Sequence, residues 1–145
     1  AAEAKLGLPG SLTPLVLVEP LSFMNASGGP VKALAAFYGV AADRMVVVHD
    51  ELDLPFGTIR TKQGGGDNGH NGLKSLRGSL GTGDFYRVRV GVGRPPGRQD
   101  PADWVLKGFG GTERRELPEV VDRATDTVEC LLTEGLEATQ NRFNG

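Results

Sequence analysis

The chain has 145 residues, of which 39% are hydrophobic and 23% are charged, and this predicts a single globular domain spanning residues 1–145. No apolar run approaches the ~20 residues of a membrane-spanning helix, and the first residues lack the basic-then-apolar pattern of a signal peptide. The only cysteine, Cys130, excludes an internal disulfide and indicates a structural thiol in a reducing compartment.

The basic side chains are unevenly distributed along a chain whose net charge is −2. Residues 57–98 carry eight basic and two acidic side chains, whereas the remainder carries eight basic and sixteen acidic ones. A local cationic excess on an acidic protein is typical of a polyanion site. Random clustering on a solvated surface is the alternative, and charge alone does not exclude it.

Hydrophobic periodicity predicts strands that alternate with helices. Strands are expected at 15–18, 45–48, 58–62 and 85–92, and helices at 31–38, 73–80, 100–106 and 117–132. Residues 1–14 are expected to be irregular, and a short tail is expected beyond Gly135. Val46, Val47 and Val48 show no polar alternation, which predicts a strand buried on both faces. The alternation predicts an α/β fold, a three-layer α/β/α sandwich with a central mixed, mostly parallel sheet.

A glycine-rich loop spans residues 62–72 between a predicted strand and a predicted helix, and five of its eleven residues are glycine. Glycine permits positive φ and lets a ligand approach the backbone closely. The loop carries His70, one of only two histidines in the chain. A flexible surface loop is the alternative interpretation, but the histidine favours a functional site.

Polar side chains follow several predicted elements, and together they suggest chemistry on an acyl group. Asparagine amides hold a carbonyl oxygen as it becomes an oxyanion, and a histidine held by a carboxylate takes a proton from water. Lysine and arginine on neighbouring strands hold phosphate. The pattern predicts hydrolysis of an acyl bond attached to something phosphorylated. The residues concerned are Asn25, Asp50, His70, Asn71, Lys62 and Arg89.

Other sites fit the sequence less well. The acidic segment 49–53 could bind a divalent metal, but consecutive residues of an extended segment point in opposite directions. The glycine-rich loop lacks the Gly-Lys-Ser/Thr ending of a nucleotide P-loop, and no serine lies in a Gly-x-Ser-x-Gly motif. His49 follows an apolar run and is expected to be a structural, hydrogen-bonded histidine.

Five motifs, in order and with the family's spacing, resemble those of bacterial peptidyl-tRNA hydrolase. They lie at residues 19–28, 49–57, 64–72, 85–98 and 140–142. The resemblance implies a cytoplasmic, monomeric esterase that needs no metal or cofactor and has no membrane or DNA partner. Its substrate would be the ester that joins a peptide to the 3′ end of tRNA, and its role the recycling of stalled peptidyl-tRNA.

The resemblance also implies roles for individual residues. Asp50 would be the carboxylate that orients the catalytic base, and His70 would support the pocket near Asn71. Lys62 and Arg89 would grip the 5′ phosphate of the tRNA. The acyl and 3′-terminal region of the substrate would be held by Phe23, Asn25 and Asn71.

Two departures from the family pattern are expected to matter. Asp67 and Asn68 replace usual loop residues, although Asn tolerates positive φ. The family's N-terminal segment, with its first strand and helix and the histidine base, has no match here. Asp50 would then have no base to orient unless His70 or His49 substitutes, and we therefore expect a shortened homologue with little hydrolase activity alone. The alternatives are a non-catalytic RNA-binding protein on the same fold and a small phosphoester-binding α/β module.

Overall fold

The structure is a computed structural model that describes residues 2–6, 13–18, 28–66, 70–93 and 111–144. The chain divides into two compact units. The first comprises Ala1–Met45 and Gln63–Tyr86, and the second comprises Val46–Lys62 and Arg87–Gly145. The expectation of a single domain stays a prediction. Within the described ranges, no helix combines the length and the apolar character that crossing a membrane requires.

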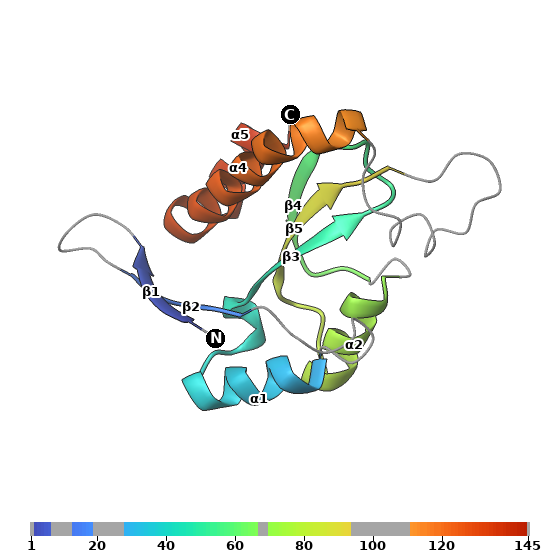
Figure 1. Cartoon of the computed structure of the whole chain (residues 1–145). Coiled ribbons are helices and arrows are strands. Elements are labelled where there is room, and N and C mark those ends of the chain that lie inside the picture. The colour runs from blue at the N-terminus through green and yellow to red at the C-terminus, as the bar shows by residue number, and fades with distance from the viewer. Residues whose placement is uncertain (1, 7–12, 19–27, 67–69, 94–110, 145) are drawn as a thin grey trace. The chain divides into compact units, whose positions relative to one another are not determined.

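The first unit contains a two-stranded antiparallel sheet of β1 (Ala2–Leu6) and β2 (Thr13–Leu17), in which Ala2 lies opposite Leu17 (Figure 1). The predicted strand near residue 15 is confirmed. The expectation that the first residues are irregular is wrong, because Ala2–Leu6 alternates apolar and charged residues and pairs with β2. Leu17 is 53% exposed, since a two-stranded ribbon cannot bury both of its faces.

Two helices of the first unit, α1 (Gly28–Tyr38) and α2 (Asn71–Leu80), pack against each other. Gly28 makes this approach possible, because a Cβ atom at that position would overlap the carbonyl group of Ser75. The Gly28 N–H donates to Ser75 Oγ at 2.8 Å. Both predicted helices are confirmed.

A three-stranded sheet has the order β3-β5-β4, with β3 (Val46–Glu51), β4 (Ile59–Gln63) and β5 (Tyr86–Gly91). The hydrogen bonds from Tyr86 N to Met45 O and from Val92 N to Glu51 O make β3 and β5 parallel. Those from Gly91 N to Thr58 O and from Gly64 N to Phe85 O make β5 and β4 antiparallel. The predicted α/β class with a mixed sheet is therefore confirmed.

The prediction that residues 46–48 are buried on both faces is wrong. Val48 is 52% exposed. The reason is the position of β3 at one end of the strand order, where no further described strand pairs with it. The strand also continues through His49, Asp50 and Glu51, so these polar residues belong to β3 itself.

The core of the second unit lies under two helices, α4 (Gly111–Glu134) and α5 (Leu136–Phe143). Its buried side chains include Ile59, Val88, Val120, Cys130 and Leu131. The long helix begins earlier than predicted, so Pro118 lies inside it. The expected short tail is helical, and Gly135 separates the two helices with a φ of 90°. The predicted helix at 100–106 lies outside the described residues.

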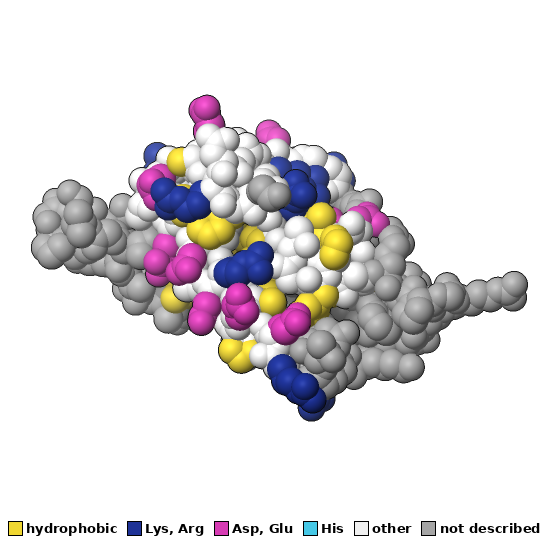
Figure 2. Space-filling view, turned by 90° about the horizontal axis from the view of Figure 1, so that it is seen from above, with side chains coloured by type: hydrophobic (Ala, Val, Ile, Leu, Met, Phe, Trp, Pro, Cys, Tyr) yellow, Lys and Arg dark blue, Asp and Glu magenta, His cyan; other side chains and the backbone are white. Residues whose placement is uncertain are grey.

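The exposed surface of α4 carries both signs of charge. Arg115, Glu116, Glu119, Asp122 and Arg123 are all exposed. In the view of Figure 2, Lys/Arg and Asp/Glu side chains are interspersed, with hydrophobic side chains scattered between them. Interspersed charges of this kind are typical of a solvated surface and create no strong field of one sign.

Candidate functional site

Four cationic side chains share one face of the sheet in the second unit. The antiparallel hydrogen bonds of β4 and β5 have one common register, which places Lys62 opposite Arg87 and Arg60 opposite Arg89. Residues directly opposite each other in an antiparallel pair point to the same side of the sheet, as do residues two apart along a strand. We call Arg60, Lys62, Arg87 and Arg89 the cationic face.

The cations of this face repel one another. The pKa of Lys62 is lowered from its ordinary value of 10.5 by burial first and then by the charges of Arg89 and Arg87. Glu51 acts in the opposite direction and raises it. The carboxylate of Glu51 lies 3.8 Å from Arg89 Nη1 and is the acidic partner of this face. Such crowding of like charge favours the binding of an anion.

The cationic face also holds donors that the described residues do not satisfy. The Nε atoms of Arg60 and Arg89 are buried, and no described group forms a hydrogen bond with either. A buried donor without a partner costs about 1–3 kcal/mol, so native structures rarely keep one without a reason. A bound phosphate would provide oxygen acceptors for both N–H groups, because arginine N–H groups commonly donate hydrogen bonds to phosphate.

Gln140 of α5 and Asn144, which directly follows α5, form hydrogen bonds with the backbone of β4, the strand that carries Arg60 and Lys62. Asn144 Oδ1 accepts the N–H of Thr61 at 2.9 Å, and Asn144 Nδ2 donates to Thr61 O at 3.2 Å. Gln140 Nε2 donates to the same carbonyl at 3.1 Å. β4 is at one end of the strand order, so these amides take the place of a neighbouring strand.

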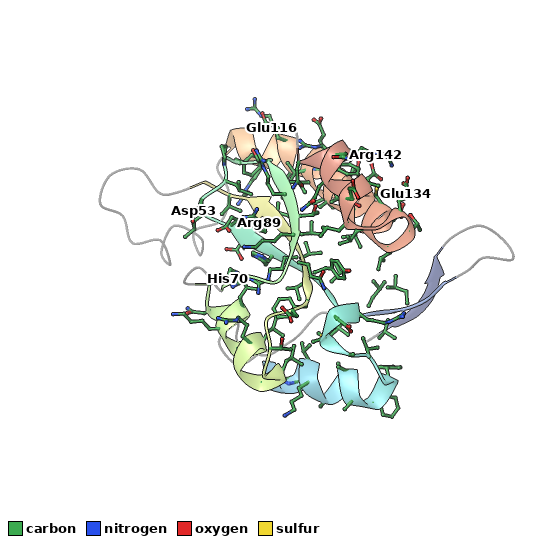
Figure 3. All side chains as sticks on the ribbon, turned by 180° about the vertical axis from the view of Figure 1, so that it is seen from behind. Asp53, His70, Arg89, Glu116, Glu134 and Arg142 are labelled. Carbon is green, nitrogen blue, oxygen red and sulfur yellow. The ribbon has the colours of Figure 1, made fainter. Side chains whose placement is uncertain are left out.

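An ion pair fastens α5 to the end of α4. Arg142 donates to both carboxylate oxygens of Glu134, at 3.0 and 3.2 Å, and Figure 3 shows the two side chains together. Hydrogen bonds from Arg142 and from the thiol of Cys130 lower the pKa of Glu134. The buried thiol also accepts the Thr139 hydroxyl at 3.3 Å, which agrees with the structural role predicted for Cys130.

Asp50 lies near the end of β3, one residue before Glu51. Successive side chains of a strand point to opposite faces. Because Glu51 faces Arg89, the alternation assigns Asp50 to the face opposite the cations. His49 Nδ1 lies 2.8 Å from the carbonyl oxygen of Asp50, to which its N–H can donate. This contact agrees with the hydrogen-bonded, structural role predicted for His49.

His70 and Asn71 lie at the start of α2, in the first unit (Figure 3). His70 is the N-cap, and its Nδ1 accepts the N–H of Leu73 at 3.2 Å. Nδ1 therefore carries no proton in this arrangement, and the ring proton is on Nε2. Asn71 is the first helical residue and is exposed. The preceding loop begins with Gly64 and Gly65, both at positive φ, as the sequence predicted.

The sequence-predicted residues are distributed as follows. Lys62 and Arg89 are brought together on the cationic face. Asp50 lies in the same unit, whereas His70 and Asn71 belong to the other. The two remaining predicted residues, Phe23 and Asn25, lie outside the described residues.

Two residues of the cationic face, Arg60 and Arg87, and the neighbouring Glu51 were not singled out as site residues from the sequence. The alternation Arg60-x-Lys62 and Arg87-x-Arg89 is the signal that could have identified the two arginines. Arg87 is 0% exposed, which no sequence pattern indicated. For the metal alternative, no group of three or more His, Cys, Asp or Glu side chains able to hold an ion is present in the described ranges.

The mixed sheet with its cationic face defines an α/β protein equipped to bind a polyanion. The family model described as Peptidyl-tRNA hydrolase matches residues 2–145. The chain belongs to the peptidyl-tRNA hydrolase family, whose members hydrolyse the ester bond of peptidyl-tRNA.

Individual relatives agree with this assignment. The chain is 61% identical to a peptidyl-tRNA hydrolase from Frankia alni, over 99% of this chain and 72% of that protein. It is 55% identical to the peptidyl-tRNA hydrolase of Pseudarthrobacter chlorophenolicus, over 98% of this chain and 71% of that one. A crystal structure of peptidyl-tRNA hydrolase from Acinetobacter baumannii matches with a TM-score of 0.82 and 31% identity, over 99% and 71% of the two chains.

The predicted family, fold class and hydrolase function are thereby confirmed. The expectation that the family's N-terminal segment and histidine base are missing is not borne out by these matches, and neither is the alternative of a non-catalytic RNA-binding protein. The roles of the individual site residues stay predictions.

Proposed function

We propose that this chain binds peptidyl-tRNA through its cationic face and hydrolyses the ester between the peptide and the 3′ end of the tRNA. The observation that carries this proposal is the face itself. Arg60 and Arg89 lie opposite each other with buried Nε–H groups that no described residue satisfies. A phosphate group accepts several hydrogen bonds at once and compensates the repulsion among the cations.

Lys62 and Arg89 are the proposed clamp for the 5′ phosphate of the tRNA. Lys62 and Arg89 are diagonal neighbours on the cationic face, and the charge of Arg89 is one cause of the lowered pKa of Lys62. A bound phosphate would favour the protonated lysine and stabilise the pair. The planar guanidinium of Arg89 offers donors from Nε and Nη, whereas Lys62 contributes a point charge.

The remaining site residues are assigned to the ester. Asp50 orients the group that takes a proton from the attacking water, and the water oxygen adds to the ester carbonyl carbon. The amides of Asn25 and Asn71 hold the acyl and 3′-terminal region, which Phe23 lines. The C–O bond to the 3′ oxygen then breaks, which leaves a peptide carboxylate and a tRNA with a free 3′ hydroxyl.

His70 is proposed to position Asn71 through α2. Its Nδ1 is engaged by the Leu73 N–H, so a role as proton acceptor through that atom would require the helix cap to break. As the N-cap, His70 fixes the first turn of the helix and with it the backbone of Asn71. We therefore assign His70 a positioning role for Asn71.

The proposal includes a cytoplasmic monomer with no cofactor and no DNA partner. Ester hydrolysis needs only water, a proton acceptor and donors for the oxyanion, all of which side chains can supply.

Release of peptide from peptidyl-tRNA tests the proposal. The unaltered chain should cleave the ester, Asp50→Asn should lower kcat by about 10²-fold or more, and Arg89→Ala should weaken substrate binding about tenfold. Arg115→Ala removes an exposed cation of α4 and serves as the matched control. Equal cleavage by the unaltered chain and Asp50→Asn would contradict the assignment of Asp50. Binding of tRNA without cleavage would contradict the hydrolase proposal.

A further inference from the structure

An acidic side chain, Glu51, lies beside the cationic face, and its presence there needs an explanation. Glu51 is the last residue of β3 and is only 8% exposed. Its Oε1 atom lies 3.8 Å from Arg89 Nη1, and it raises the pKa of Lys62, against the effect of the neighbouring arginines. The carboxylate thus acts on both members of the proposed phosphate clamp.

A carboxylate at this position has two opposing effects on phosphate binding. Its charge repels the phosphate and reduces the net attraction of the face. It also pairs with one edge of the Arg89 guanidinium, and a guanidinium fixed in one orientation loses less conformational entropy when it binds. Burying a carboxylate is itself costly unless it is paired. Maximal attraction alone would therefore favour a neutral residue at position 51.

We infer that Glu51 is a positioning residue for the phosphate clamp, because it orients the guanidinium of Arg89 toward a terminal 5′ phosphate. The negative charge of Glu51 at the same time weakens the non-specific attraction of the cationic face for RNA. This inference rests on the proposed function of Lys62 and Arg89. The contact uses Nη1 of Arg89, and the buried Nε–H of the same side chain keeps no described partner. The guanidinium is thus ion-paired with Glu51 at one nitrogen and has a second donor for phosphate.

Binding of the full chain to two short RNA duplexes that copy a tRNA acceptor stem tests the inference. One duplex carries a 5′ phosphate and the other a 5′ hydroxyl, and the ratio of their Kd values measures recognition of the terminal phosphate. Glu51→Gln keeps the size of the side chain and removes its charge. The ratio should fall about fivefold, while affinity for the 5′-hydroxyl duplex should stay equal or rise, because a repulsive charge is gone.

Two further variants show whether the effect depends on the charge of Glu51 or only on the shape of its side chain. Glu51→Asp keeps the charge and should retain most of the ratio. Glu116→Gln removes an exposed acid of α4 and should leave the ratio unchanged. A fall of the ratio in Glu51→Asp as large as in Glu51→Gln, with both variants folded by circular dichroism, would assign the effect to shape and overturn the inference. An unchanged ratio in Glu51→Gln would overturn it as well.

Arg89→Ala distinguishes failure of this inference from failure of the proposed clamp. If the clamp exists, Arg89→Ala lowers the ratio by itself, and adding Glu51→Gln lowers it no further, because the carboxylate acts through the guanidinium. A full additional loss in the double variant would overturn the positioning role while leaving the clamp intact. An unchanged ratio in Arg89→Ala would overturn the clamp, and the inference with it.

Discussion

Asn144 completes the edge of the sheet at Thr61. Its side-chain amide accepts the Thr61 N–H at 2.9 Å and donates to the Thr61 carbonyl at 3.2 Å, as a neighbouring strand would. Thr61 stands between Arg60 and Lys62, so the contact fixes the backbone from which two cations of the face project. The end of the chain and the proposed phosphate site are therefore connected through one residue.

Replacement of Asn144 should destabilise the chain. Asn144→Ala leaves the N–H of Thr61 without its partner in a buried position, at a cost of about 1–3 kcal/mol in the free energy of unfolding. Urea denaturation followed by circular dichroism measures this change. Asn141→Ala is the control, because Asn141 is exposed on the same helix and should change stability by less than about 0.5 kcal/mol. Equal losses in the two variants would argue against the edge contact.

Two glycines of the first unit should respond oppositely to alanine. Gly28→Ala forces a Cβ atom into the backbone of Ser75 and should destabilise the packing of α1 on α2 by about 1–3 kcal/mol. The Cβ atom that Gly78→Ala adds meets no atom within 4 Å beyond its chain neighbours and its own helix backbone. This variant should therefore stabilise the chain by about 0.5–1 kcal/mol, because alanine favours the helix more than glycine does. Thermal unfolding of both variants checks the signs, and a stabilising Gly28→Ala would contradict the close helix contact.

The protonation of Lys62 should depend on the other charges of the cationic face. Its pKa lies below 10.5, so the unfolded chain binds this proton more tightly, and stability should rise with pH between the folded and unfolded pKa values. Arg89→Ala removes a repelling charge and should raise the pKa, whereas Glu51→Gln should lower it. NMR titration of the Lys62 side chain measures both shifts. A pKa that neither substitution moves would refute the proximity of these groups.

Salt dependence should identify the phosphate contacts. Each cation that neutralises a phosphate adds about one to the slope of log K against log salt concentration, so Lys62→Ala and Arg89→Ala should each reduce the slope by about 1. The unaltered chain and Arg115→Ala should share one slope, because the mixed charges of α4 are not assigned to RNA binding. Titration of fluorescent tRNA between 50 and 200 mM salt, roughly the range where such losses are large, provides the comparison.

Much of the architecture follows from local patterns in the sequence. The alternation of Val88 and Val90 with Arg87 and Arg89 predicted β5, and the spacing of Leu73, Leu76 and Leu80 predicted α2. The exposure of Val48 was not predictable from the sequence of β3. It depends on which strands lie beside β3 in the sheet, and the residues of β3 do not specify these neighbours. β1 was missed although Ala2–Leu6 alternates apolar and charged residues, because the strand forms by pairing with β2, which its own five residues do not specify.

The site was predictable to a smaller extent. Lys62 and Arg89 were identified because basic residues concentrate in one segment and match a family motif. Glu51 escaped attention because four of the five residues 49–53 are polar or charged. Only strand alternation and register reveal which of them faces Arg89. The edge contact of Asn144 with Thr61 joins positions 83 residues apart, which no local pattern encodes.

The most direct test of the cationic face is an NMR titration of the chain with the 5′-phosphorylated acceptor-stem duplex. The Nε–H signals of Arg60 and Arg89 should shift on binding, because the phosphate supplies the acceptors that these buried donors lack among the described residues. The 5′-hydroxyl duplex should shift them much less at the same degree of saturation. Equal shifts with the two duplexes, or no shift of either signal, would contradict the account.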